Sequence, residues 1–225
     1  KSLSRDNNAP FLYETNVGAA LPVISTLNNL INSGDKIIKI EAVLSGTLNY
    51  IFNNFQEINT FHEIVTNAVD LGYTEPDPKI DLCGIDVSRK ILILARESGY
   101  KLEFKDINKN HFLPDESVNA KSKDEFLSSL KKNNDHFNAI LEDAKENNSR
   151  LKFVAKLEKG KASVGLKAVK SNHPFYNLVG SDNITVFHTE RYKKSPLVVK
   201  GAGAGGEFTA SGVFADIIKA SQENG

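Results

Sequence analysis

Two alternating runs of apolar and polar residues on either side of a short turn restrict the fold of this chain more than any other feature. The runs are residues 151–158 and 162–169, and the turn is centred on Lys159, Gly160 and Lys161. Alternation with a period of two is typical of strands with one buried face, and a glycine turn between two such runs predicts a β-hairpin. We therefore expect a sheet that contains antiparallel strands.

Helical patterns and further β-rich runs surround this hairpin. Thr60 and Glu63 form a capping box, which predicts a helix that ends near Gly72. Asp81 is expected to lie at the N-cap of a long helix. The remaining expected elements are helices at 27–31, 48–55, 82–97, 123–131, 135–146 and 208–221, and strands at 36–44, 183–190 and 197–200. This mixture predicts an α+β fold with a mixed β-sheet and helices packed on one face.

The charge balance and the cysteine content exclude several classes of protein. The chain has 28 basic and 28 acidic residues, so no strong field favours nucleic acid or an anionic membrane. No apolar run approaches the roughly 20 residues needed to span a bilayer. Cys83, the single cysteine, has no disulfide partner in the chain, which indicates a reducing compartment such as the cytoplasm. Methionine is absent, so we expect a fragment of a longer protein.

The densest group of ionisable residues lies between positions 73 and 90. It includes Glu75, Asp81, Asp86 and Lys90, and the last two are four residues apart on one face of an apolar helix. Two interpretations stay open: a surface ion pair of a few tenths of a kcal/mol, or a lysine with a tuned pKa that donates a proton in a partly dry site. The rigid loop before the helix, with Tyr73 and Glu75, favours a site.

A glycine-rich turn precedes the last expected helix. Gly201, Gly203 and Gly206 match the spacing of a dinucleotide-binding fingerprint. That motif needs an acidic residue at the end of a second strand about 20 residues later, and the chain ends at Gly225. We therefore do not expect a complete Rossmann site here. The turn could still bring backbone amides to a phosphate or ribose, or serve close packing alone.

A third candidate begins at Glu14 and continues through a run of small residues to Pro22. A carboxylate beside exposed main-chain carbonyls could hold a hard cation, although a plain loop is the simpler interpretation. The five histidines have no spacing typical of metal ligands.

The residues between 68 and 90 resemble the signature of the homoserine dehydrogenase family. The matching positions are Ala68, Gly72, Tyr73, Thr74, Glu75, Pro76, Asp77, Pro78, Asp81, Leu82, Gly84, Asp86 and Lys90. Three other stretches fit the same family in order: TNVGAALPVI at 15–24, LSGTLNYIF at 44–52, and KGAGAGGEFTASGVFAD at 200–216. The resemblance covers essentially the whole chain and is least specific between Asp106 and Arg150.

The resemblance implies an oxidoreductase that reduces aspartate semialdehyde to homoserine with NADPH or NADH. It assigns the catalytic pair to Lys90, which would protonate the oxygen, and Asp86. It implies substrate contacts for Glu75, Asp81, Tyr73, Gly46 and Thr47, and a cofactor contact for Gly205. It also implies a monovalent cation such as sodium, held by Glu14 and the carbonyls of Val17, Ala19 and Leu21.

The same resemblance implies a domain plan. Residues 1–14 would be a linker from a missing Rossmann domain, residues 15–200 the substrate-binding, catalytic and dimerisation domain, and residues 201–225 a turn and helix that pack toward the nucleotide-binding domain. The sheet would form a homodimer interface, with no nucleic-acid or membrane partner. The fragment alone is expected to be inactive. The segment TNVGAALPVI favours a fused aspartokinase–homoserine dehydrogenase.

Two other functions stay open at this point. The domain could have lost its chemistry and serve in dimerisation, but a decayed site would be expected to lose some of Glu75, Asp81, Asp86 and Lys90, since such groups are unfavourable when buried without partners. A related dehydrogenase could also act on another amino-acid aldehyde. The carboxylate-rich loop favours a substrate with an ammonium group.

Overall fold

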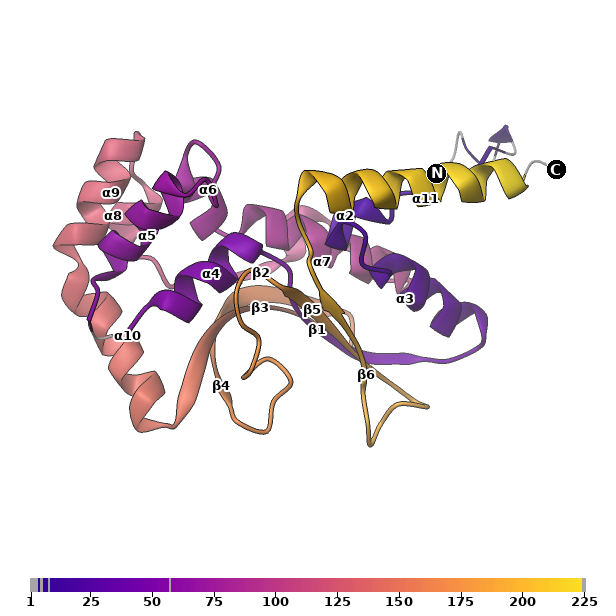
Figure 1. The fold of residues 1–225 in the computed structure, drawn as a ribbon. Helices are drawn as coiled ribbons and strands as arrows, with labels where there is room; N and C mark the ends of the chain where they lie inside the picture. Colours follow the sequence, from indigo (N-terminus) through magenta and orange to yellow (C-terminus); the bar gives the residue numbers. More distant parts are fainter. Residues whose placement is uncertain (1–3, 5, 8, 57, 224–225) are drawn as a thin grey trace.

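The computed structural model describes residues 4, 6–7, 9–56 and 58–223, and a six-stranded sheet lies at its centre (Figure 1). The strand order is β2-β4-β3-β1-β5-β6, and each neighbouring pair is antiparallel except β2 and β4, which are parallel. The strands are β1 (Ile37–Val43), β2 (Asn108–Asn110), β3 (Ser149–Glu158), β4 (Lys161–Lys170), β5 (Asn183–Thr189) and β6 (Leu197–Gly201). The predicted mixed sheet is confirmed.

The hairpin of β3 and β4 forms as the alternating runs predict. Glu158 pairs with Lys161, and the two residues between them, Lys159 and Gly160, have φ angles of 50° and 74°. Two successive left-handed residues give a turn whose twist matches that of the flanking strands. The glycine supplies this conformation without strain.

The helices cover one face of the sheet, as Figure 1 shows. α4, α7 and α10 pack against β3, and in the core beneath them the rings of Phe61 and Phe137 stack with centroids 4.2 Å apart. The helices are α2 (Thr15–Gly18), α3 (Val23–Asn32), α4 (Gly46–Asn54), α5 (Phe61–Asp70), α6 (Pro78–Leu82), α7 (Ile85–Glu97), α8 (Asp115–Val118), α9 (Lys123–Lys132), α10 (Asn134–Glu146) and α11 (Gly206–Glu223). The α+β fold is confirmed. No helix within the described ranges has both the length and the apolar character needed to cross a membrane.

The long helix expected after Asp81 is divided in two, so that part of the prediction is wrong. α6 begins at Pro78 because Asp77 caps its N-terminus and proline is favoured at the first helical position. Gly84 then separates α6 from α7 in a left-handed conformation with φ of 65°. Asp81 therefore lies inside α6, and its side chain is available to the loop before that helix.

The sequence did not indicate the short elements α2, α8 and β2. β2 is a polar strand of three residues, Asn108–Asn110, with no alternation to reveal it. It is defined by its parallel pairing with β4, a contact between distant parts of the chain.

The face of the sheet opposite the helices carries both charged and apolar side chains. The loop between β4 and β5 covers part of this face, where Phe175 and Leu178 join a buried cluster with valines from the sheet. Beside the cluster, the Lys39 ammonium lies 2.7 Å from the Glu41 carboxylate. Burial opposes ionisation of Glu41, but hydrogen bonds from His173 and Lys39 lower its pKa to about 2.

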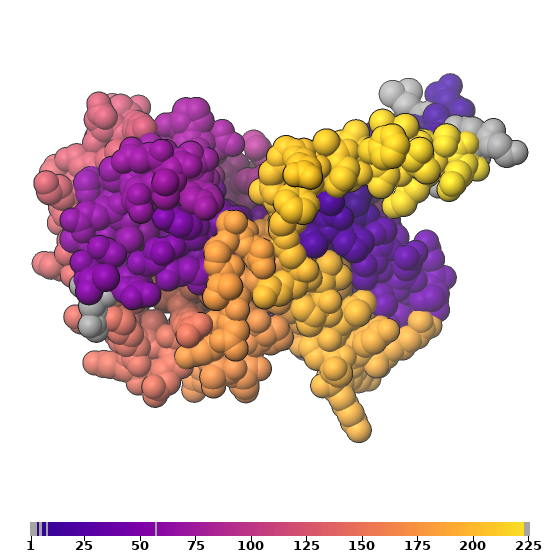
Figure 2. Space-filling view, in the orientation of Figure 1, coloured from indigo at the N-terminus to yellow at the C-terminus, as the bar shows by residue number. Residues whose placement is uncertain are grey.

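α11 leaves the sheet after the glycine-rich turn and projects along one edge of the molecule (Figures 1 and 2). It contacts α2, where Gly212 lies against the carbonyl of Ala19. Several of its large apolar side chains are exposed: Phe208, Val213, Phe214, Ile217 and Ile218. An exposed apolar face of this kind is typical of an interaction surface.

Candidate active site

A cleft of about 520 Å³ lies where α4, α6, α7 and the glycine-rich turn before α11 converge. It draws its walls from segments far apart in the sequence. The lining residues are Leu44, Ser45, Gly46, Thr47, Gly72, Tyr73, Thr74, Glu75, Asp81, Asp86, Val87, Lys90, Ser181, Gly203, Ala204 and Gly205. The structure therefore brings together every residue for which the sequence predicted a catalytic, substrate or cofactor role.

Lys90 lies in this cleft with its ammonium held from two sides. Its Nζ is 2.8 Å from Asp86 Oδ2 and donates a hydrogen bond of 2.9 Å to the carbonyl of Leu44. The Lys90 side chain is 16% exposed and that of Asp86 is 61% exposed. An ammonium group has three donors, so one N–H remains for a ligand in the cleft. The ion pair therefore lies in a cleft that partly buries Lys90, which distinguishes it from an ion pair on the open surface.

Asp81 and Glu75 bring two carboxylates to the same cleft. The backbone N–H of Glu75 donates to Asp81 Oδ2 over 2.9 Å, which ties the loop to α6. Burial raises the pKa of Asp81; the hydrogen bond from Glu75 opposes this change and the negative charge of Glu75 adds to it. Two neighbouring carboxylates that repel each other are stabilised by a cation placed between them.

The N-terminus of α4 forms another wall. Ser45 caps the helix by accepting the N–H of Leu48 over 3.1 Å, while Gly46 and Thr47 occupy the first helical positions. The Thr47 hydroxyl donates to the carbonyl of Tyr73 over 2.5 Å, and the Tyr73 ring stacks on Tyr50 at 4.3 Å. Free N–H groups at a helix N-terminus attract an anion.

Ser181 is a wall residue that the sequence did not reveal. It comes from the loop before β5, and its backbone oxygen lies 3.0 Å from where a β-carbon on Gly46 would be. No local motif surrounds it, since it joins the cleft only through folding. The sequence signal that relates to this contact is Gly46, because its lack of a side chain permits the backbone of Ser181 to approach the N-terminus of α4.

The glycine-rich turn closes the cleft above the start of β5. A β-carbon on Gly203 would lie 1.9 Å from Nδ2 of Asn183, so only glycine fits. Asn183 is 1% exposed, and neither polar atom of its amide has a partner within the described residues. Gly205 has a φ of 113° and precedes α11. The bare backbone here suits close approach by a planar ligand.

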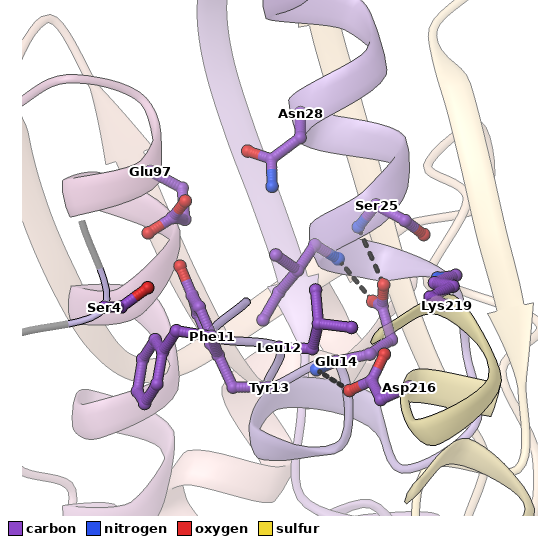
Figure 3. A pocket seen from close by; sticks show the side chains of 11 residues that line it. Ser4, Phe11, Leu12, Tyr13, Glu14, Ser25, Asn28, Glu97, Asp216 and Lys219 are labelled. Atoms are coloured by element: carbon purple, nitrogen blue, oxygen red, sulfur yellow. Dashed lines mark hydrogen bonds between the residues drawn. The ribbon is translucent and has the colours of Figure 1, made fainter. Parts of the chain in front are cut away.

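None of the four predicted cation residues lines this cleft, and one of them, Glu14, lines a second cavity of about 350 Å³ (Figure 3). The two carboxylate oxygens of Glu14 accept the N–H groups of Ile24 at 2.7 Å and Ser25 at 2.8 Å, near the N-terminus of α3. Asp216 of α11 accepts the N–H of Glu14 at 3.1 Å. Glu14 therefore joins α2, α3 and α11, a role that the sequence did not suggest, and its cation role stays a prediction.

Comparison with solved structures places the chain among dehydrogenases. A hyperthermophilic archaeal homoserine dehydrogenase in complex with NADPH superposes with a TM-score of 0.74, at 28% identity over 99% of this chain and 59% of that one. A Candida auris protein of unknown function gives a TM-score of 0.88, at 40% identity over 93% of this chain and 60% of that one.

Sequence comparison then defines the family. The homoserine dehydrogenase profile matches residues 22–218, and the chain belongs to the homoserine dehydrogenase family. A bifunctional aspartokinase/homoserine dehydrogenase of Zea mays is 46% identical over 98% of this chain, and the homoserine dehydrogenase of Schizosaccharomyces pombe is 42% identical over 96%. The chain spans 24% of the maize protein and 60% of the yeast one.

Proposed function

We propose that this domain binds aspartate semialdehyde and catalyses its reduction to homoserine, with NADPH or NADH as hydride donor. The observation that carries the proposal is the position of Lys90, held by Asp86 and the Leu44 carbonyl, in one cleft with Glu75 and Asp81. Reduction of an amino-acid aldehyde requires a proton donor for the aldehyde oxygen, and a pair of carboxylates can bind the ammonium group of such a substrate.

The carboxylates and the helix N-terminus would bind the two ends of the amino-acid group. Glu75 and Asp81 would hold the substrate ammonium, because a cation relieves the repulsion between them. The N–H groups of Gly46 and Thr47 would receive the substrate carboxylate at the N-terminus of α4. Tyr73, fixed by its stack on Tyr50, would border the carbon chain.

Lys90 would then act at the aldehyde oxygen. Negative charge develops on this oxygen as hydride adds to the carbonyl carbon, and an ammonium in a partly dry site stabilises that charge. Transfer of one proton from Lys90 to the oxygen completes the alcohol, and Asp86 keeps the ammonium in place.

The glycine-rich turn would meet the cofactor from this side of the cleft. The bound nicotinamide supplies the hydride, and Gly205 with its neighbours offers backbone without side chains. The complex of the archaeal homoserine dehydrogenase with NADPH supports a nicotinamide cofactor for this domain. The choice between NADPH and NADH depends on residues that read the ribose 2′ position.

The direct test measures absorbance of reduced nicotinamide in the presence of homoserine and NADP or NAD. We expect activity in the complete protein and little or none in residues 1–225 alone, since one glycine turn supplies the only cofactor contact proposed here. A complete protein that oxidises no homoserine with either cofactor contradicts the proposal. Turnover of a different amino-acid aldehyde would show that the domain acts on another substrate of the same class.

Replacing Asp81 with Asn is expected to raise KM for homoserine by roughly 10- to 100-fold with a smaller effect on kcat. The amide keeps an oxygen for the Glu75 N–H but loses the charge that holds the ammonium, and hydrogen bonds to charged groups are worth about 1.5–3 kcal/mol. Steady-state kinetics in the complete protein measure this change. Asp70→Asn, an exposed site at the end of α5, is the control; equal KM values in both variants would reject the role.

The proposed domain plan assigns residues 1–14 and 201–225 to contacts with a nucleotide-binding domain and 15–200 to the catalytic domain. The exposed apolar side chains of α11 support this plan. We also propose a homodimer through the open face of the sheet, where Val198 and Ile38 are exposed. Similarity to bifunctional aspartokinase/homoserine dehydrogenases supports fusion to an aspartokinase.

We further propose a sodium ion held by Glu14 and the carbonyls of Val17, Ala19 and Leu21. One carboxylate with several main-chain oxygens suits a hard cation, and a carboxylate oxygen can accept an N–H and still contact an ion. Such an ion would strengthen the link between α2 and α3. The cytoplasm remains the proposed compartment, supported by the free thiol of Cys83.

A further inference from the structure

Lys152 is a fully buried lysine that the proposed chemistry does not use. It lies on β3 three residues before Ala155, the first residue of that strand to pair with β1, and its side chain is 0% exposed. Burial lowers its pKa to about 8, and the positive charge of Arg150 adds to this change. A buried ammonium is unfavourable unless its donors are satisfied, so its partners define its role.

The Lys152 ammonium has three acceptors in two different elements. Its Nζ donates to Asn49 Oδ1 at 3.1 Å and to Asn53 Oδ1 at 2.5 Å, both on α4. It also donates to the carbonyl of Leu178 at 2.5 Å, in the loop before β5. All three ammonium donors are therefore used, and Lys152 joins α4 to that loop.

The two asparagines extend the same connection. Asn49 Nδ2 donates to the carbonyls of Gly180 at 3.1 Å and Asp182 at 3.2 Å, and Asn53 Nδ2 donates to Gly180 at 3.1 Å. The carbonyls on both sides of Ser181 are thus fixed to α4. Lys152 orients both amides, because each turns its oxygen toward the ammonium and its nitrogen toward the loop.

This network determines where one wall of the cleft stands. Ser181 lines the cleft, and its backbone oxygen approaches Gly46 at the N-terminus of α4. A shift of residues 178–182 would move Ser181 away from Gly46 and Thr47. The end of the cleft assigned above to the substrate carboxylate would then widen.

We propose that Lys152 is a positioning residue: with Asn49 and Asn53, it holds residues 178–182 against α4 so that Ser181 forms the substrate-binding wall. This inference rests on the proposed function for its kinetic consequence, but its structural part is independent. The network joins the helix to the loop through a charged centre, so an apolar replacement could preserve packing and still release the loop.

The test compares Lys152→Met with Lys156→Met in the complete protein. Lys156 lies four residues further along β3 on the same face, and its partner is Glu158 at 2.8 Å, outside the network. We expect faster hydrogen–deuterium exchange at residues 178–183 only in Lys152→Met. We also expect KM for homoserine to rise by roughly 10- to 100-fold with a smaller change in kcat, since displacement of a binding wall misplaces the substrate.

Asn53→Ala provides a milder variant if Lys152→Met does not fold, and the same local exchange and a smaller rise in KM are expected. Exchange at 178–183 equal to wild type in these variants would overturn the proposal. Faster exchange with unchanged KM would overturn the role in substrate binding. If the wild-type protein has no activity with homoserine, the proposed function fails, while the exchange measurement still decides the positioning role.

Discussion

Replacing Lys90 with Met is expected to lower kcat for homoserine oxidation by about 10²–10⁴-fold, the usual contribution of a general acid or base. Methionine has a similar length but no proton, so nothing would compensate the charge that develops on the substrate oxygen. The hydrogen bond to the Leu44 carbonyl would also be lost. Steady-state kinetics and thermal unfolding in the complete protein separate the chemical effect from folding.

Lys132→Met is the matched control, because Lys132 also forms an ion pair, 3.5 Å from Glu116, but on the exposed surface. Its kcat should equal that of the wild type. Asp86→Asn tests the other half of the pair, and we expect a reduced kcat with folding retained. Near-normal turnover in Lys90→Met would reject the catalytic role.

Replacing Gly84 with Ala is expected to lower the free energy of unfolding by about 2–5 kcal/mol. A left-handed conformation is unfavourable for a residue with a β-carbon by roughly 1–2 kcal/mol, and overpacking a core adds about 1–3 kcal/mol. Both effects apply, because Gly84 has a φ of 65° and its β-carbon would lie 2.5 Å from the ring of Phe153. Urea denaturation measures the change.

Gly99, at the other end of α7, provides the control for this substitution. It has a φ of 88° and no atom within 4 Å of its β-carbon position, so Gly99→Ala carries only the conformational effect of about 1–2 kcal/mol. The difference between the two variants isolates the contact with Phe153. Equal losses of stability would show that the core accommodates the extra carbon.

The elements that the sequence predicts correctly are those with local causes. The capping box of Thr60 and Glu63 forms as expected, and α5 begins at Phe61, directly after Thr60. The hairpin follows from alternation and a glycine turn within one short stretch. The division between α6 and α7 was not predicted, although its causes are also local: Asp77 caps α6, and Gly84 has a left-handed conformation between the two helices.

The residues of the candidate site also fall into a group that the sequence predicts and a group that only the structure reveals. Lys90, Asp86, Asp81 and Glu75 occur within one segment, so spacing and a family resemblance find them together. Ser181 and Lys152 have no such signal, since their roles arise from contacts with α4 that only the folded chain creates. A lysine in an alternating strand is typical of an exposed face, and burial of Lys152 cannot be read from that pattern.

The contact between Gly203 and Asn183 has a consequence for how sequences of this kind can diverge. The two side-chain positions occupy the same space, since a β-carbon at 203 would lie 1.9 Å from the Asn183 amide. Residue 203 can gain a side chain only after residue 183 has become smaller, whereas the reverse order passes through a sterically excluded intermediate. The two positions therefore form an epistatic pair with a fixed order of mutation, and related sequences should carry a side chain at 203 only where residue 183 is smaller than asparagine.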